Sequence, residues 1–183
     1  MRDVGGPEGR CEDLMTARRE VEPEAGPLPE PALVLRPATP ADLPALIQLE
    51  AACFTGDRLS RRSLRRLLRA ATAATIVSVA SGHVVGYALV LFRKDARVAR
   101  LYSLARDTAW QGRGLGAALL DAVEAQSRAR GAVEIRLEVG VDNAPARTLY
   151  RRHGYVETGR LKGYYEDGTD AVRMRKRLGD PPR

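Results

Sequence analysis

Three glycines alternate with other residues at positions 112, 114 and 116, directly before a stretch whose apolar residues recur at helical spacing. Glycine lets the backbone turn sharply, and it lets a ligand approach the backbone N–H groups without meeting a Cβ atom. Such N–H groups at the start of a helix favour an anion, because the helix dipole is positive there. The sequence therefore predicts a phosphate-binding loop followed by a helix; the alternative is a loop that only connects a strand to that helix.

Two other phosphate-binding motifs fit this loop less well. A P-loop ends in Gly-Lys-Ser or Gly-Lys-Thr, whereas Gly116 is followed by two alanines. The segment Gly112 to Ala117 does satisfy the Gly-x-Gly-x-x-Ala form of the Rossmann fingerprint. In that fold the first strand runs almost directly into the first glycine, but here residues 106–111 intervene. The chain after residue 100 is also too short for two mononucleotide-binding halves, so a Rossmann domain is disfavoured.

Periodicity along the rest of the chain predicts an α/β fold. Helices are expected at 39–54, 60–70, 115–130 and 145–153, and strands at 33–36, 75–80, 84–92, 97–105, 134–139, 155–158 and 171–178. A strand–helix–strand unit set among antiparallel strands indicates a mixed, mostly antiparallel central sheet flanked by helices. Cys53 falls on the apolar face of the first helix and is expected in the core.

The chain of 183 residues suits one folded domain. Residues 1–31 are rich in Pro, Gly and Glu and are expected to be a disordered tail, followed by a domain at 32–179 and a short tail at 180–183. No apolar run is long enough to span a membrane and the N-terminus does not resemble a signal peptide, so a cytoplasmic location is expected. The two cysteines predict no disulfide framework, and no Cys/His spacing predicts a metal site.

Positive charge is concentrated in the predicted domain. Residues 1–31 carry eight acidic and four basic side chains, so the remaining residues carry +11 when the total is +7. The outer face of the helix predicted at 60–70 contributes five of these charges, from Arg61, Arg62, Arg65, Arg66 and Arg69. Most such faces are only solvated; the alternative is a surface for an acidic or ribosomal partner.

The glycine loop and its surroundings resemble the GNAT N-acetyltransferases. Gln111-x-x-Gly114-x-Gly116 matches the acyl-CoA signature of that family, Arg/Gln-x-x-Gly-x-Gly/Ala. Residues 33–178 further resemble the RimI group of ribosomal-protein alanine N-acetyltransferases, most closely in Leu104-Ala105, Leu137-Glu138-Val139, Asn143, Leu149-Tyr150, Gly154-Tyr155, Gly163 to Gly168, Asp170-Ala171 and Met174. The resemblance implies a single GNAT-like domain with a β-α-β acetyl-CoA-binding unit. It also implies an acyltransferase that uses acetyl-CoA as co-substrate and no metal.

The resemblance also assigns binding residues. It implies that the strand backbone at Leu104, Ala105 and Arg106 contacts the thioester and pantetheine, and that Asn143 contacts CoA; Asn143 is otherwise a helix cap. Tyr164 and Tyr165 would wall the acceptor site, although two tyrosines equally well pack on the core. The loop itself would hold the CoA pyrophosphate through Gln111, Gly112, Arg113, Gly114, Leu115, Gly116 and Ala117.

Glu138 and Tyr150 are the candidate catalytic pair. In the strand predicted at 134–139, apolar and polar side chains alternate, so the polar face that holds Glu138 must border a cleft, an ion pair or the end of the sheet. By resemblance, Glu138 accepts the proton of the amine and Tyr150 returns a proton to the CoA sulfur. The alternatives are an ion pair of Glu138 with Arg136 or Arg147, and a Tyr150 that only packs.

The acceptor is the least determined part of this interpretation. An α-amino group has a pKa near 8 and a lysine amine one near 10.4, so a protein or peptide N-terminus is the easier amine to deprotonate. A lysine or a small-molecule amine remains an alternative, and so does a non-catalytic module that binds CoA or RNA. Gly140 departs from the RimI group, which has arginine beside the expected peptide groove, and this weakens the assignment of a ribosomal protein as acceptor.

Overall fold

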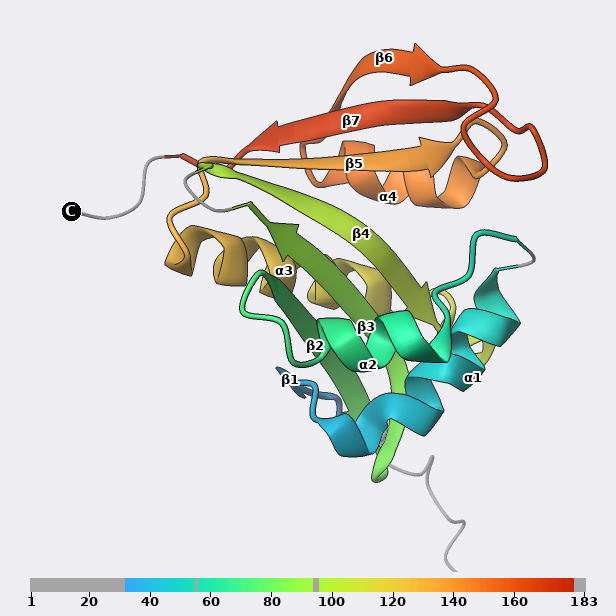
Figure 1. Cartoon of the computed structure of the whole chain (residues 1–183), viewed down its shortest axis with the longest axis vertical. Helices are drawn as coiled ribbons and strands as arrows, with labels where there is room; N and C mark the ends of the chain where they lie inside the picture. Colours follow the sequence, from blue (N-terminus) through green and yellow to red (C-terminus); the bar gives the residue numbers. More distant parts are fainter. Residues whose placement is uncertain (1–31, 55, 94–95, 180–183) are drawn as a thin grey trace, which may run out of the picture. The chain divides into compact units, whose positions relative to one another are not determined.

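The computed structural model describes residues 32–54, 56–93 and 96–179, so both predicted tails lie outside the described residues. The described residues form one seven-stranded sheet in the order β1-β2-β3-β4-β5-β7-β6 (Figure 1). Every neighbouring pair is antiparallel except β4 and β5, which are parallel. The predicted mixed, mostly antiparallel α/β sheet is therefore confirmed.

The elements follow the predicted order, with boundaries that move by a few residues. The strands are β1 (Val34–Pro37), β2 (Ala73–Ala80), β3 (His83–Phe92), β4 (Val98–Arg106), β5 (Glu134–Gly140), β6 (Val156–Leu161) and β7 (Ala171–Arg177). The helices are α1 (Leu43–Cys53), α2 (Arg61–Leu67), α3 (Leu115–Ala129) and α4 (Ala144–Arg152), with short 3₁₀ turns η1 (Pro40–Asp42) and η2 (Thr108–Trp110).

Side-chain hydrogen bonds define where the first helix begins. Thr39 precedes the turn η1, and the Asp42 carboxylate accepts hydrogen bonds from the Thr39 backbone N–H (2.7 Å) and hydroxyl (3.0 Å). The same carboxylate forms an ion pair with Arg36 of β1 (2.8 Å), and this guanidinium is the main reason that the pKa of Asp42 falls to about 2. The start of the helix is thereby fixed to the first strand.

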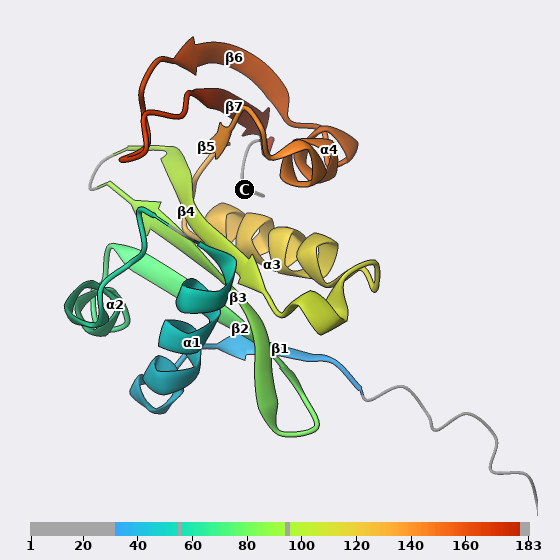
Figure 2. The same ribbon diagram turned by 90° about the vertical axis from the view of Figure 1, so that its right-hand side faces the viewer.

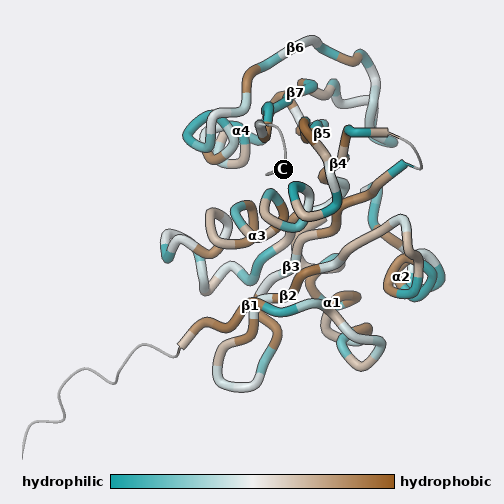
Figure 3. The backbone as a smooth tube through the Cα atoms, turned by 90° about the vertical axis from the view of Figure 1, so that its left-hand side faces the viewer, coloured by the Kyte–Doolittle hydropathy of each residue, from teal (hydrophilic) through white to brown (hydrophobic). Residues whose placement is uncertain are grey.

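Helices cover both faces of strands β2 to β4. Helices α1 and α2 pack on one face, and α3 packs on the opposite face (Figure 2). Each side has its own apolar core, and the three α3 residues Leu119, Leu120 and Val123 are fully buried. Burial of each such side chain stabilises the fold by about 1.5–3 kcal/mol relative to exposure. In Figure 3 the inner strands are largely brown, whereas the turns of α2 are teal.

Strands β4 and β5 separate soon after they meet. They pair only from Val98↔Glu134 to Arg100↔Arg136. On their other edges β5 stays paired with β7 and β4 with β3 to the ends of both strands. A bulge helps β4 to turn away, because Val90 pairs with Leu101 and Leu89 with Ser103, which leaves Tyr102 without a β3 partner. The facing edges of β4 beyond Arg100 and of β5 beyond Arg136 are therefore not paired with each other.

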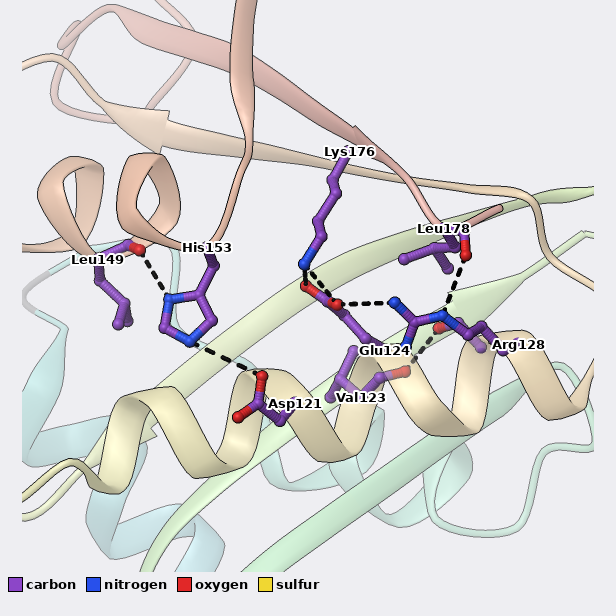
Figure 4. Close-up of polar contacts among 9 residues, drawn as sticks. Asp121, Val123, Glu124, Arg128, Leu149, His153, Lys176 and Leu178 are labelled. Carbon is purple, nitrogen blue, oxygen red and sulfur yellow. Dashed lines mark hydrogen bonds and ion pairs between the residues drawn. The ribbon is translucent and has the colours of Figure 1, made fainter. Parts of the chain in front are cut away.

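A buried charge cluster connects α3 to the strands beyond this separation (Figure 4). Glu124 of α3 is 2% exposed, and its two carboxylate oxygens accept hydrogen bonds from Lys176 of β7 at 2.7 and 2.6 Å. Arg128, one turn along α3, lies 3.2 Å from the same carboxylate and donates to the Leu178 carbonyl at 3.1 Å. The burial of a carboxylate is favourable only when it is paired in this way.

Cys53 is not in the core, contrary to the expectation from the sequence. It ends α1 as an exposed residue, and its thiol donates to the Arg106 carbonyl at the end of β4 (3.2 Å). The apolar residues of α1 that do reach the core are Leu43, Leu46 and Leu49. None of the helices in the described part of the chain is long and apolar enough to cross a bilayer.

Candidate active site

Backbone geometry makes the glycine loop suitable for an anion. Gly112 and Gly114 have φ of +78° and +73°, a conformation that side-chain-bearing residues rarely adopt. The hydrogen-bond ladder of α3 begins where Ala118 N–H donates to the Gly114 carbonyl (3.0 Å). The three preceding amides, of residues 115–117, therefore have no acceptor within the helix. They stand at the positive end of a helix of fifteen residues.

Gly116 is needed for a different reason. Its backbone is helical, but an added Cβ would lie 3.1 Å from Leu149 Cδ2 of α4. Because glycine removes that contact, α4 packs closely on the first turn of α3. The third glycine of the motif therefore brings the helix after β5 close to the predicted phosphate loop.

The side chains around the loop hold its entry in place. The Asp107 carboxylate caps η2 by accepting a hydrogen bond from the Ala109 backbone N–H (2.9 Å). The backbone N–H of Gln111 donates to the Thr108 carbonyl (3.0 Å). Trp110 packs against the core, and the Arg113 guanidinium lies 5.3 Å from the centre of its ring. Arg113 thus has a cation–π contact that orients it at the mouth of the loop.

The predicted strand-edge residues occupy the end of β4. Leu104, Ala105 and Arg106 pair with β3 on one side through Ala88, Tyr87 and Gly86. On the other side β5 has already left, so this edge has no strand partner. The Arg106 carbonyl accepts the Cys53 thiol.

Asn143 is a helix cap, as the alternative interpretation of this residue anticipated. Its side-chain oxygen accepts a hydrogen bond from the Ala146 amide at the start of α4 (3.1 Å). The side chain is exposed at the junction of β5 and α4. Its amide nitrogen and the second lone pair of its oxygen stay available for a ligand.

Glu138 lies on β5 just beyond the last residue pair that joins β4 to β5. Its side chain is 10% exposed and is held between two arginines that the sequence interpretation did not name. The Arg100 guanidinium of β4 contacts Oε2 at 2.8–2.9 Å, and Arg173 Nε of β7 donates to Oε1 at 3.3 Å. The alternative partners Arg136 and Arg147 were wrong, because they pair with Glu134 and Glu157. An ion pair does exist, but it is formed across strands.

Tyr150 is buried on α4 with its ring 5.6 Å from that of Tyr155. Burial, with a smaller contribution from the neighbouring Tyr165 phenol, raises the pKa of Tyr150 above its ordinary value near 10. The phenol therefore stays protonated at neutral pH. A buried phenol of this kind has a proton to give and little tendency to lose it to water.

Tyr164 and Tyr165 belong to the loop between β6 and β7, and their rings meet edge to face at 5.1 Å. Tyr164 is 40% exposed, and its hydroxyl accepts a hydrogen bond from Arg100 (2.7 Å). Tyr165 lies 3.7 Å from where a Cβ on Gly140 would be, and burial is the main cause that raises its pKa to about 12. The Tyr165 ring therefore lies within ordinary contact distance of the end of β5 at Gly140.

A second loop contacts the tyrosine loop. Asp57, between α1 and α2, accepts a hydrogen bond from the Glu166 backbone amide (3.0 Å). Asp57 has a φ of +50°, a strained value for a residue with a side chain, and this contact is one of the interactions that hold it there. The segments 56–60 and 162–170 therefore meet beside the residues that flank Glu138.

The structure thus brings the predicted residues into two groups. Gln111 to Ala117 and the β4 end form one, and Glu138, Tyr164 and Tyr165 form the other with Tyr150 beside them. Sequence reasoning missed Arg100, Arg173 and Asp57. Their only signal was charge in otherwise unremarkable segments, since their roles depend on strand register and loop contacts.

Comparison with known proteins adds to this geometry. The profile of the acetyltransferase (GNAT) family matches residues 43–155, which is more than half of the chain. The chain belongs to the GNAT acetyltransferase family.

This GNAT protein resembles N-alpha-acetyltransferase RimI of Mycobacterium tuberculosis, with 36% identity over 147 residues, 78% of this chain and 91% of that relative. It is 33% identical over 138 residues to aminoglycoside N(6′)-acetyltransferase type 1 of Stenotrophomonas maltophilia, which covers 71% and 90% of the two chains. The crystal structure of the ribosomal-protein-S18-alanine N-acetyltransferase from Escherichia coli has the same fold, with a TM-score of 0.74, 24% identity, and coverage of 83% of this chain and 97% of that one.

These findings confirm that the chain is a GNAT acyltransferase, an N-acetyltransferase with RimI-like sequence. GNAT enzymes use acetyl-CoA, and the fold predicted from that resemblance is the one observed. The individual roles of Glu138, Tyr150 and the loop residues stay predictions, because the comparisons concern whole chains and not single side chains.

Proposed function

We propose that this enzyme transfers the acetyl group of acetyl-CoA to the N-terminal α-amine of a protein, with Glu138 as base and Tyr150 as acid. The observation that carries the proposal is the separation of β4 and β5. It leaves the β4 edge beyond Arg100, which includes residues 104–106, and the β5 segment that carries Glu138 without strand pairing to each other. Such a site admits a thioester from the loop side and an amine from the tyrosine side.

The glycine loop fits the diphosphate of CoA. Residues 115–117 offer amides without helical acceptors, and Gly112 and Gly114 have no Cβ to block a phosphate. Within 4 Å of the position that a Cβ would take at either glycine there is open space, so a ligand has access to the backbone. The amide-lined helix start and the unpaired β4 edge together suit an extended phosphorylated thioester.

The proposed step is a direct attack. The amine nitrogen bonds to the thioester carbonyl carbon, the carbon–sulfur bond breaks, and the sulfur leaves as a thiolate that takes one proton. Glu138 removes a proton from the attacking amine, directly or through water. Tyr150 gives its proton to the sulfur. The protons balance between the two residues, and no metal is required.

Arg100 and Arg173 hold the proposed base in one orientation. The Arg100 guanidinium contacts Oε2 of Glu138 at 2.8–2.9 Å, and Arg173 Nε donates to Oε1 at 3.3 Å. Each arginine therefore holds a different oxygen of the carboxylate. An acceptor amine that approaches beside Tyr164 would meet an oriented carboxylate.

Similarity and chemistry both favour a protein N-terminus as acceptor. The relative from Mycobacterium tuberculosis is named an N-alpha-acetyltransferase and is matched over 91% of its length. An α-amine is also easier to deprotonate than a lysine amine by about 2.5 pKa units. We propose further that the acceptor is the N-terminus of a ribosomal protein and that the enzyme acts in the cytoplasm.

A small-molecule amine is the second candidate. One specific observation favours it: the aminoglycoside acetyltransferase matches at 33% identity over 90% of its length. The pocket of about 370 Å³ between α4 and β6, lined by Val141, Arg147, Glu157, Gly159, Arg160 and Val172, contains none of the predicted site residues and offers this candidate no support.

Acceptor profiling separates the two candidates. The purified enzyme is offered labelled acetyl-CoA with peptides that have a free N-terminus, with the same peptides blocked at the N-terminus but containing lysine, and with aminoglycosides and polyamines. We expect label on the free N-termini, and the Glu138→Gln variant should lose most of that activity. Label only on aminoglycosides or polyamines would replace the proposed acceptor by a small amine.

A further inference from the structure

The outer face of α2 is the most basic surface element of the described chain. Its exposed guanidinium groups come from Arg61, Arg62, Arg65, Arg66 and Arg69, which we call the α2 arginine face. They surround a hollow of about 490 Å³ that is lined by Arg62, Arg65, Arg66, Arg69 and Ser63. In Figure 3 the turns of α2 are teal and lie at the outside of the molecule.

This arrangement destabilises the isolated helix. Arg61 and Arg65, and likewise Arg62 and Arg66, are like charges four residues apart, and each such pair costs a few tenths of a kcal/mol. Arg61 and Arg62 also stand in the first turn, where the helix dipole disfavours cations. Burial of Leu64, with Leu67 and Leu68 half-buried, fixes the orientation of the helix so that the arginines face outward.

No carboxylate in the described part of the chain compensates this charge. From Arg58 to residue 94 the sequence contains no Asp or Glu. Within residues 32–54, 56–93 and 96–179, none of the five guanidinium groups forms a hydrogen bond or an ion pair. Most arginines of the strands are instead paired with carboxylates. Concentrated, uncompensated charge of one sign fits a partner of the opposite sign.

The composition of the face favours a nucleic-acid backbone over an acidic protein. Stable protein–protein contacts are built around buried apolar or aromatic anchors, and α2 exposes none, because its three leucines turn inward. Binding to phosphodiester backbones needs no such anchor, since release of counterions supplies most of the affinity. Arginine rather than lysine suits phosphate, because its planar fork bonds two oxygens at once.

The position of the face is equally informative. Asp57, which contacts the tyrosine loop through the Glu166 amide, precedes Arg61 by only four residues. The N-terminal end of α2 is therefore joined by a short segment to the loop that flanks the proposed acceptor site. The preference for RNA over DNA rests on the proposed function. An enzyme that acetylates protein N-termini meets them on the ribosome, which contains RNA.

We propose that the α2 arginine face is a docking surface for the phosphate backbone of RNA, which brings RNA-bound protein N-termini to the acceptor site. The full chain is titrated against a fluorescent RNA duplex of 20 base pairs over a range of salt concentrations. The wild type is compared with Arg62→Gln/Arg66→Gln/Arg69→Gln. The matched control is Arg93→Gln/Arg152→Gln/Arg177→Gln, which removes the same charge from exposed positions elsewhere.

The α2 variant should bind RNA at least about tenfold more weakly, and its salt slope should fall by about two to three, since each lost phosphate contact removes about 0.9. The control variant should lose less than about threefold. Both variants should melt like the wild type and acetylate a free peptide at the wild-type rate, so loss of RNA binding is separable from failure of the proposed acetylation.

Three outcomes would overturn the inference. An equal loss of RNA affinity in both triple variants would mean that the net charge of the protein, and not the α2 arginine face, determines binding. A DNA duplex of the same sequence that binds as tightly as the RNA would assign the face to DNA. A polyglutamate peptide that competes with the RNA at equal charge concentration would assign the face to an acidic protein.

Discussion

The burial of Tyr150 supports its proposed role as the proton donor. Burial raises the pKa of its phenol, so the proton is present at every pH at which a GNAT enzyme works. The Tyr150→Phe change removes that proton and little volume. We expect kcat to fall by about 100-fold, the lower range for loss of a general acid, with acetyl-CoA affinity changed less than about threefold. Steady-state kinetics and calorimetric titration measure the two quantities.

Tyr155→Phe is the matched control for this change. Its ring lies 5.6 Å from that of Tyr150, and burial likewise raises the pKa of its phenol. A proton donor is specific to position 150 if Tyr155→Phe keeps near-wild-type turnover. Equal loss in both variants would mean that the two phenols matter through packing, and Tyr150 would no longer be the acid.

For Glu138, the sequence predicts the strand face on which the side chain lies but not its ion-pair partners. Alternation along the strand correctly placed its side chain on a polar face that forms an ion pair. Its two partners could not be predicted from the sequence. Arg173 lies directly opposite Glu138 in the β5–β7 register, and Arg100 lies on β4, the strand that separates from β5. Register is set by contacts across the whole sheet, and sequence spacing does not contain it.

Helix α3 is the element on which the cofactor proposal depends, and its two ends allow a controlled comparison. Gly114 at its start and Gly131 after its end have φ of +73° and +80°, and both would place a Cβ in open space. An alanine at either position adopts an unfavourable left-handed conformation, which costs about 1–2 kcal/mol. The two substitutions should therefore lower the free energy of unfolding by similar amounts.

Ligand binding should distinguish the two ends. Gly114→Ala places a methyl group at the loop amides and should weaken acetyl-CoA binding at least about tenfold, or ~1.4 kcal/mol. Gly131→Ala should leave binding unchanged, since it lies about 25 Å away along the helix axis. Thermal melts with and without acetyl-CoA give both the stability loss and the ligand-induced shift. An unchanged shift for Gly114→Ala would remove the loop from the site.

The elements themselves were predictable because local signals agree with the tertiary structure. Glycines end α3 and α4, and Thr39 and Asn143 stand at helix starts, so helix limits were correct within a few residues. Strand β6 was the weakest case. It runs to Leu161 through the exposed segment Val156–Leu161, where no alternation of burial marks its length. Pairing with β7 defines it, and that is a long-range interaction.

At the scale of the whole domain, the central property is a sheet that divides into two parts. Strands β1 to β4 and strands β5 to β7 share only three residue pairs along the β4–β5 junction. Packing of α3 is therefore needed to connect them, and the Glu124 cluster supplies a specific contact from α3 to β7 (Figure 4). The sequence predicted both parts but not this connection, because a single Glu on an amphipathic helix is ordinarily assigned to solvent.

The Glu124–Lys176 pair should accordingly behave as a buried ion pair. Lys176→Met leaves a carboxylate that is 3% exposed with Arg128 as its remaining cation, and should cost about 3 kcal/mol in urea unfolding. The double change Glu124→Leu/Lys176→Met should recover most of that loss, because no charge is then left buried. The exposed Arg160–Asp170 pair is the control, and Arg160→Gln should cost less than about 1 kcal/mol. If the double variant were as unstable as the sum of its two single changes, the residues would act independently and the pair would not connect the two parts of the sheet.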